Sequence, residues 1–132
     1  MMKISTKGRY ALRAMVELAK IKGQKKITLK EIAKGQDLSI KYLASLLVKL
    51  QDKKLVNSYK GKLGGYELGK DANKISIEEI FEAVEGPIDL VFCIDQPGNC
   101  LKSSDCKARE IWSKIGKDLK DVFKKYYLSD LV

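Results

Sequence analysis

The stretch TLKEIAKGQDLSIKYLASLLVKLQDK, residues 28–53, decides the fold of this chain. Residues 28–31 form a capping box, in which a threonine and a glutamate satisfy the free amide groups of a first helical turn. This predicts a short helix to about Lys34, followed by a tight turn. Ser39 can then cap a second helix that runs to about Lys53. Two helices joined by so short a connection predict a helix-turn-helix unit.

The two faces of the second predicted helix differ in chemistry. The residues expected inside are Ile40, Leu43, Leu47 and Leu50, and those expected outside are Lys41, Ser45, Lys49 and Asp52, with Tyr42 at the margin. Short polar and basic side chains near the N-terminus of such a helix are typical of a recognition helix that touches base edges. The alternative is an ordinary pair of helices packed at a corner.

A hairpin is predicted directly after this helix, from residues 55–59 and 66–68. Its connection, KGKLGG at 60–65, is rich in glycine, which allows the positive φ angles of a turn. Lys60 and Lys62 lie at the tip, and a basic tip of this kind can rest on phosphates or enter a minor groove. A hairpin that is basic by chance is the alternative. Its position after two helices favours a DNA-binding wing.

Three further helices are expected around this unit. The first covers 7–22, with Ala11, Met15, Leu18 and Ile21 on one face. Another follows the capping box at 76–79 and stops at Gly86-Pro87. The last is long, begins at a cap among Ser103, Ser104 and Asp105, and ends near Tyr127. Its apolar stripe comprises Ile111, Ile115, Leu119, Val122 and Tyr126, widened by Trp112 and Phe123.

The predicted fold class is therefore mainly α with a small β-hairpin wing: a winged helix-turn-helix followed by a long C-terminal helix. That helix is about 35 Å long at 1.5 Å per residue, more than one small domain can cover. We expect it to pair with a second copy of the chain, since two-fold operators need two-fold proteins. Packing on its own domain is the alternative.

Composition limits the classes of function that we expect of this chain. The net charge is +9, from 26 Lys+Arg against 17 Asp+Glu, which suits double-stranded DNA as a partner. No apolar run is long enough for a membrane span, and the N-terminus lacks a signal-peptide core, so a cytoplasmic location is expected. Histidine is absent, and we find no C-x-x-C, nucleotide loop or nucleophile–base pair. An enzyme is not indicated.

All three cysteines lie in one stretch, Cys93-x6-Cys100-x5-Cys106. Three thiolates on one loop can hold a soft metal or an iron–sulfur cluster. A structural zinc site normally has four ligands at closer paired spacing. A thiol switch and three incidental cysteines are the other interpretations.

Three segments resemble the Rrf2 family of transcriptional regulators, in the branch that includes the iron–sulfur regulator IscR: the opening STKGRYAL at 5–12, the wing GGYELGKD at 64–71, and the cysteine loop. The resemblance covers essentially the whole chain. It implies a dimeric winged-helix DNA binder with a winged domain at 1–87, a cluster loop at 88–106 and a dimerisation helix at 107–132.

The resemblance also implies roles for individual residues. Cys93, Cys100 and Cys106 match the cluster-binding cysteines, for a [2Fe–2S] or a [4Fe–4S] cluster. Lys41, Tyr42, Ser45 and Lys60 fall where members touch DNA. The full set of expected DNA contacts is Arg9, Thr28, Ser39, Lys41, Tyr42, Ser45, Lys49, Lys60, Gly61, Lys62, Gly64 and Tyr66.

One departure concerns the fourth cluster ligand. Arg109 stands where that branch has a histidine, and arginine, being permanently protonated, cannot ligate iron. Asp105 and Glu110 are the nearest carboxylates. A small thiol, a water or a carboxylate of the second subunit are further candidates.

The expected function is a homodimeric, cluster-sensing transcriptional regulator. The first alternative is a cofactor-free Rrf2-type regulator of cysteine or sulfur metabolism, which acts through a thiol switch or a partner enzyme. Such relatives generally lack the cysteine triplet. A non-specific architectural DNA binder is a further alternative.

Overall fold

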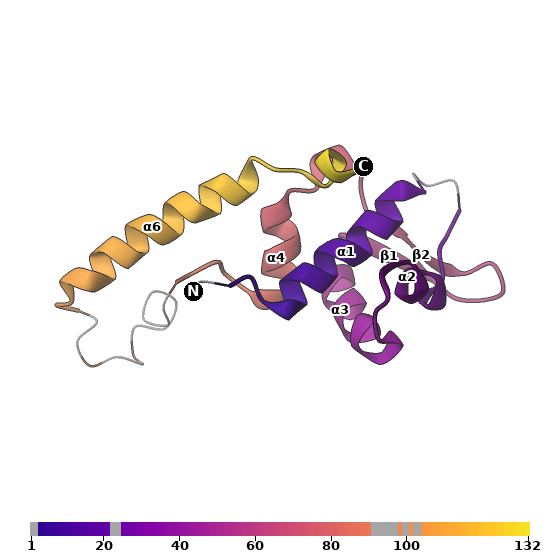
Figure 1. Cartoon of the computed structure of the whole chain (residues 1–132), viewed down its shortest axis with the longest axis horizontal. Coiled ribbons are helices and arrows are strands. Elements are labelled where there is room, and N and C mark those ends of the chain that lie inside the picture. The colour runs from indigo at the N-terminus through magenta and orange to yellow at the C-terminus, as the bar shows by residue number, and fades with distance from the viewer. Residues whose placement is uncertain (1–2, 22–24, 91–97, 99–100, 102–103) are drawn as a thin grey trace.

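The fold is described from a computed structural model, which describes residues 3–21, 25–90, 98, 101 and 104–132 (Figure 1). The structure is mainly helical with one two-stranded antiparallel sheet, which confirms the predicted fold class. In chain order the elements are α1 (Thr6–Lys20), α2 (Leu29–Gln36), α3 (Ile40–Asp52), β1 (Val56–Tyr59), β2 (Gly65–Leu68), η1 (Ala72–Lys74), α4 (Ile77–Glu85), α6 (Lys107–Lys124) and η3 (Leu128–Leu131).

Hydroxyl side chains begin four of the helices. Ser5, Thr28, Ser39 and Ser76 each accept a hydrogen bond from the amide three residues on, which satisfies a donor with no partner inside the helix. The caps predicted at 28, 39 and 76 are confirmed.

The end predicted for α2 was too early. The helix continues past Lys34 to Gln36. It stops because Asp37 adopts a left-handed conformation, with φ 54°, and its amide bonds to the carbonyls of Ala33 and Lys34. The turn between the two helices is therefore shorter than the predicted 35–38 and begins at Asp37. α1, in contrast, ends earlier than predicted, at Lys20 and not at residue 22.

The core lies between α1, α2, α3 and α4. Buried leucines on α3 are Leu43, Leu46, Leu47 and Leu50, a stripe at the i, i+3, i+4, i+7 spacing of a helix. The prediction that Ile40 lies inside was wrong, since its side chain is 46% exposed. Ile40 is the first residue of α3, and this end of the apolar stripe lies outside the buried core.

The hairpin is tied to the helix-turn-helix by a third short segment. Ile27, just before α2, exchanges two backbone hydrogen bonds with Tyr66 of β2, at 3.0 and 2.8 Å. Gly65 makes this approach feasible: its φ is +146°, and a Cβ there would lie 2.8 Å from the Ile27 carbonyl oxygen. The wing is thus fixed to the start of α2 as well as to the end of α3.

The last helix differs from the prediction at both ends. Its N-cap is Cys106, whose sulfur accepts a hydrogen bond from the Arg109 amide at 3.4 Å, and not Asp105 or a neighbouring serine. It ends at Lys124, before the predicted Tyr127, because the Tyr126 carbonyl accepts from the Ile77 amide at 2.8 Å instead of continuing the helix. Tyr126 therefore follows the helical stripe and is not part of it.

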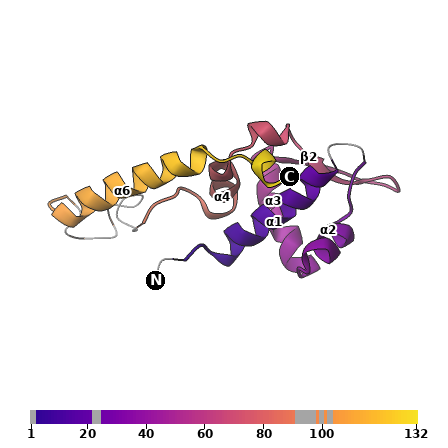
Figure 2. The ribbon, with the colours of Figure 1, turned by 45° about the horizontal axis from the view of Figure 1, so that its top comes forward.

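After α6 the chain returns to the core. The Leu128 amide bonds to the Ile75 carbonyl at 2.9 Å, and the Leu128 side chain is fully buried. Figures 1 and 2 show α6 extending away from the compact body, which it joins near its C-terminal end. The long helix is therefore anchored at one end.

The contact between α4 and α6 combines an aromatic pair with ion pairs. The rings of Phe81 and Phe123 meet edge to face, with centroids 5.4 Å apart. Lys120 lies 3.2 Å from a Glu82 carboxylate oxygen, and Lys124 lies 3.8 Å from Glu78. These pairs direct α6 along one side of α4.

We expect Leu128→Ala to lower the free energy of unfolding by about 2–5 kcal/mol, because it leaves a cavity in a packed core. Leu131→Ala is the matched control, since Leu131 lies in the same short helix but is 48% exposed. Urea unfolding followed by circular dichroism measures both. Equal, small losses for the two variants would contradict the assignment of Leu128 to the core.

Glu78 predicts a pH dependence of stability. Burial, reinforced by the nearby Glu82 carboxylate, raises the pKa of Glu78 above its ordinary 4.5, although Lys124 opposes the shift. Between 4.5 and the raised pKa, the native state binds more protons than the unfolded chain. The contribution of this group to stability therefore falls as the pH rises through that window.

We expect Glu78→Gln to remove this dependence. Unfolding free energies of both proteins, measured in urea at successive pH values from 4.5 upward, test the expectation. The wild type should lose stability relative to the variant as the pH rises. A constant difference between the two proteins would contradict it.

Candidate nucleic-acid interface

The outer face of α3 carries the predicted base-contacting residues. Lys41, Ser45 and Lys49 are exposed there, whereas Tyr42 is half-buried. The exposed Ser45 hydroxyl donates to the Tyr42 carbonyl at 2.6 Å, which leaves its oxygen able to accept a further hydrogen bond. The Tyr42 ring meets the Tyr10 ring of α1 edge to face, with centroids 5.7 Å apart. Because the contact with Tyr10 restricts the Tyr42 ring, this side chain can contact a base edge with little loss of conformational entropy.

Two arginines of α1 flank the same aromatic pair. The guanidinium carbons of Arg9 and Arg13 lie 5.9 and 5.3 Å from the centroid of the Tyr10 ring, within cation–π range. Arg9 is exposed and also donates to the Thr6 hydroxyl at 3.3 Å. Positive charge therefore lies beside the start of α3.

A polar network, which sequence reasoning missed, fixes α2 against α1. Arg13 donates to the Gln36 side-chain oxygen at 3.0 Å and also to the Gln36 carbonyl. Gln36 in turn donates to Glu17, which pairs with Lys20 at 2.9 Å. Burial alone would raise the pKa of Glu17, but the hydrogen bonds from Lys20 and Gln36 lower it overall. The network therefore ties the C-terminal end of α2 to α1, directly before the turn that leads into α3.

Two side-chain contacts hold the wing near its turn, where Tyr59 ends β1. The Tyr59 hydroxyl donates to Glu67 at 2.7 Å, which raises the pKa of the phenol. The Lys26 ammonium lies 4.3 Å from the centroid of the Tyr59 ring. The Tyr66 side chain is half-buried. Its backbone forms the bridge to Ile27, which secures β2.

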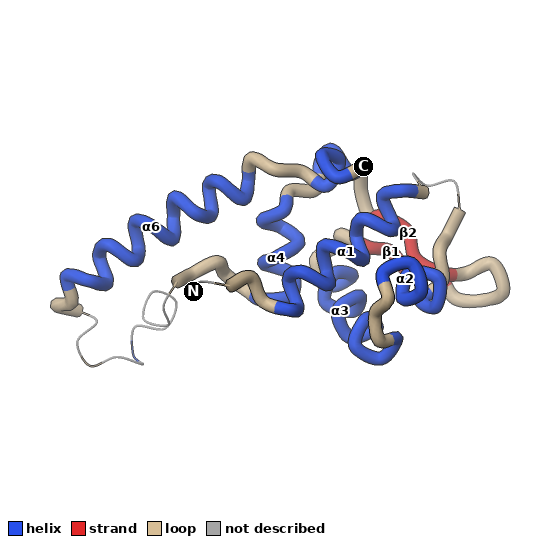
Figure 3. Tube along the Cα trace, in the orientation of Figure 1, coloured by secondary structure: helices blue, strands red, loops and turns tan. Residues whose placement is uncertain are grey.

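Most of the predicted DNA contacts lie in two places, namely α3 with its N-cap and the hairpin. In Figures 1 and 3, α3 and the hairpin lie toward the end of the molecule opposite the free end of α6. The exposed members of the set are Arg9, Thr28, Ser39, Lys41, Ser45, Lys49, Lys60, Gly61 and Lys62; Tyr42, Gly64 and Tyr66 are half-buried. The hydroxyls of Thr28 and Ser39 already cap helices.

Of the three cysteines of the loop, only Cys106 is among the described residues, and Cys93 and Cys100 lie outside them. Cys106 is half-buried at the N-terminus of α6. The position suits a negatively charged sulfur, because the N-terminal end of a helix carries partial positive charge. Asp105 is exposed, and Glu110 lies 3.9 Å from Lys107. Within the described ranges, no three Cys, His, Asp or Glu side chains converge on a metal site.

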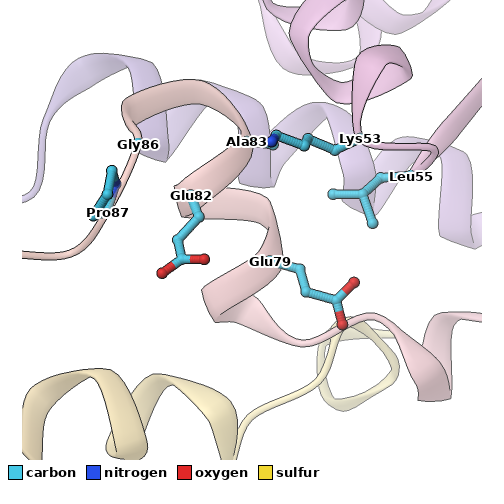
Figure 4. A pocket seen from close by; sticks show the side chains of 7 residues that line it. All are labelled: Lys53, Leu55, Glu79, Glu82, Ala83, Gly86 and Pro87. Atoms are coloured by element: carbon cyan, nitrogen blue, oxygen red, sulfur yellow. The ribbon is translucent and has the colours of Figure 1, made fainter. Parts of the chain in front are cut away.

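A cavity of about 320 Å³ between α4 and the end of α3 is not a catalytic cleft (Figure 4). Its lining includes Lys53, Glu79 and Glu82. Glu79 pairs with Lys70 at 2.7 Å, and Glu82 pairs with Lys120. Both carboxylates therefore already have a lysine partner. Across the part of the chain that the structure describes, no helix has the length and apolar character that a bilayer crossing requires.

Comparison with known proteins identifies relatives along the whole chain. Residues 4–132 match the Rrf2 family model, described as an iron-dependent transcriptional regulator. The HTH-type transcriptional regulator CymR of Bacillus subtilis is 40% identical over 130 residues, 98% of this chain and 89% of that protein. IscR of Vibrio campbellii is 34% identical over 131 residues, 99% of this chain and 77% of that protein.

A solved structure supports the same relationship. The structure of CymR, the global cysteine regulator of B. subtilis, matches with a TM-score of 0.80 at 40% identity, over 99% of this chain and 96% of that one. Family and fold agree with a helix-turn-helix regulator and not with an enzyme. The chain therefore belongs to the Rrf2 family of DNA-binding transcriptional regulators.

Proposed function

We propose that this regulator is a homodimer that senses through an iron–sulfur cluster held by Cys93, Cys100 and Cys106. The observation that carries the proposal is the clustering of all three cysteines in the stretch that leads into α6. In this proposal residues 1–87 read DNA, 88–106 hold the cluster and 107–132 dimerise. When bound, the cluster supplies iron-centred electron transfer and ligand exchange, which differ from the disulfide chemistry of thiols alone.

The chemistry of the donors fits such a cluster. Three thiolates suit iron, and the described member of the set, Cys106, places its sulfur at a helix N-terminus. Arg109 cannot be the fourth ligand. Asp105 and Glu110 are the candidates within the chain, and both are exposed next to Cys106.

The dimer proposal rests on the surface of α6. Throughout this helix, every residue of which is described, Gly116 is the only buried residue. Apolar side chains that remain substantially exposed include Ile111, Trp112, Ile115 and Val122. A second copy of the same helix offers the complementary apolar face, and its two-fold symmetry matches that of an operator.

Coupling between the loop and the DNA-reading helices would run through α4. The cysteine stretch leads into the N-terminus of α6, and α6 contacts α4 through Phe81 and Phe123. α4 in turn packs against α1 and α3. In this proposal, a change that tilts α6 would reach α3, which carries Lys41 and Ser45, through α4.

A second candidate function is a cofactor-free regulator of cysteine or sulfur metabolism that acts through a thiol switch or a partner enzyme. The 40% identity with CymR, named as a global cysteine regulator, favours it. The cysteine triplet favours the cluster. Iron and sulfide content separates the two candidates.

We expect Lys60→Ala to weaken DNA binding and to reduce the slope of log affinity against log salt by about 1, since one phosphate contact is lost. Lys60→Arg should restore the slope. Lys117→Ala is the control, because Lys117 is exposed on α6. Fluorescence anisotropy on a duplex that the wild type selects from a randomised library measures all four proteins. An unchanged slope in Lys60→Ala would remove the wing from the interface.

We expect anaerobically purified wild type to contain iron and sulfide in near-stoichiometric amounts, and Cys100→Ala to lose both while keeping its helical circular dichroism. Iron, sulfide and visible absorbance measure this. A colourless wild type that cannot be reconstituted would favour the cofactor-free candidate. Unfolding of Cys100→Ala would assign the loop a structural role.

A further inference from the structure

The tip of the wing carries an apolar side chain that is almost fully exposed. Leu63 is 90% exposed, against 46% for Ile40 and 58% for Val48. A single exposed leucine is common on protein surfaces and by itself needs no explanation. The backbone around Leu63 gives it a defined position.

Leu63 occupies a central position of a closed turn. The Gly64 amide donates to the Gly61 carbonyl at 3.0 Å, so Lys62 and Leu63 form the apex between them. Gly61 has φ +98°, and a Cβ on it would meet no neighbouring atom within 4 Å. The turn therefore holds Leu63 outward, at the furthest point of the hairpin, next to two exposed lysines.

The turn connects two strands whose positions are fixed by several contacts. β1 and β2 are in register from Val56–Leu68 to Tyr59–Gly65, and the bridge from Ile27 secures β2 at the side. The stacking of Lys26 on Tyr59 and the hydrogen bond from Tyr59 to Glu67 hold the last pair before the turn. A tip held in this way loses little conformational freedom when it meets a partner.

We propose that Leu63 is a minor-groove contact, whose side chain enters the groove of the bound duplex while Lys60 and Lys62 lie on the flanking phosphates. This rests on the proposed contact of the wing with DNA. Lysines on a phosphate backbone supply affinity without sequence preference. An apolar wedge instead packs on sugars and base edges, partially unstacks a step and favours sequences that deform easily. Leu63 thus adds selectivity for flexible pyrimidine–purine steps.

The test compares Leu63→Ala, Leu63→Met and Leu131→Ala with the wild type. Leu131 is an exposed leucine near the C-terminus, outside the wing. The probe is the duplex that the wild type selects from a randomised library, labelled at both ends for energy transfer. Affinity is measured by anisotropy over a range of salt concentrations, and bending is measured by energy transfer.

We expect Leu63→Ala to weaken binding about five- to twentyfold, to reduce the bend and to leave the salt slope unchanged. Leu63→Met should restore most of the affinity, because it keeps an apolar side chain of similar volume. Leu131→Ala should bind as the wild type does. Because Leu63 and Leu131 are 90% and 48% exposed, all variants should fold.

Two results would overturn the inference: Leu63→Ala binding and bending DNA as the wild type does, or a loss of affinity accompanied by a changed salt slope. The Lys60→Ala variant separates this failure from that of the wing assignment. If Lys60→Ala lowers the slope while Leu63→Ala has no effect, the wing touches DNA without a wedge. If neither variant has an effect, the wing itself lies off the DNA.

Discussion

The apolar face of α6 is the constraint on which the rest of the molecule depends. In this fully described helix only Gly116 is buried, although Trp112 and two isoleucines lie along its length. Helical stability in proteins comes mostly from packing of an amphipathic face, and a helix without such packing is marginal in water. A second copy of the chain would cover this face, and pairing through α6 would place two recognition helices under one symmetry axis.

The anchoring of α6 explains how such a dimer could act as a sensor. Its C-terminal end is secured by Leu128 in the core and by the bond between Ile77 and Tyr126. Its N-terminal end begins at Cys106, in the proposed cluster loop. The end of the helix that would respond to a cluster is therefore the end less constrained by the core. If a bound cluster stabilises one arrangement of α6 more than another, the population shifts toward that arrangement.

Local sequence signals predicted the DNA-reading part well. Thr28, Ser39 and Ser76 each begin a helix as expected, because capping depends on a few neighbouring residues. Features that arise from distant segments were missed, namely the return of Leu128 to the core, the bridge from Ile27 to the wing and the bonds of Arg13 to Gln36. Local pattern also gave the wrong ends for α2 and α6, since an unexpected left-handed Asp37 and a long-range bond from the Ile77 amide to the Tyr126 carbonyl end these helices. For the cysteine loop, the sequence predicts three cysteine ligands but no fourth ligand, which depends on folding or on a second subunit.

The measurement that tests this account most directly is the mass of the purified chain in solution, by sedimentation equilibrium at the concentrations at which it binds DNA. The account predicts a species of about twice 14.8 kDa, which dissociates without unfolding when Ile115, 41% exposed on α6, is replaced by glutamate. A wild-type chain that remains monomeric while binding its selected duplex would contradict it, because α6 would then have no second copy to cover it.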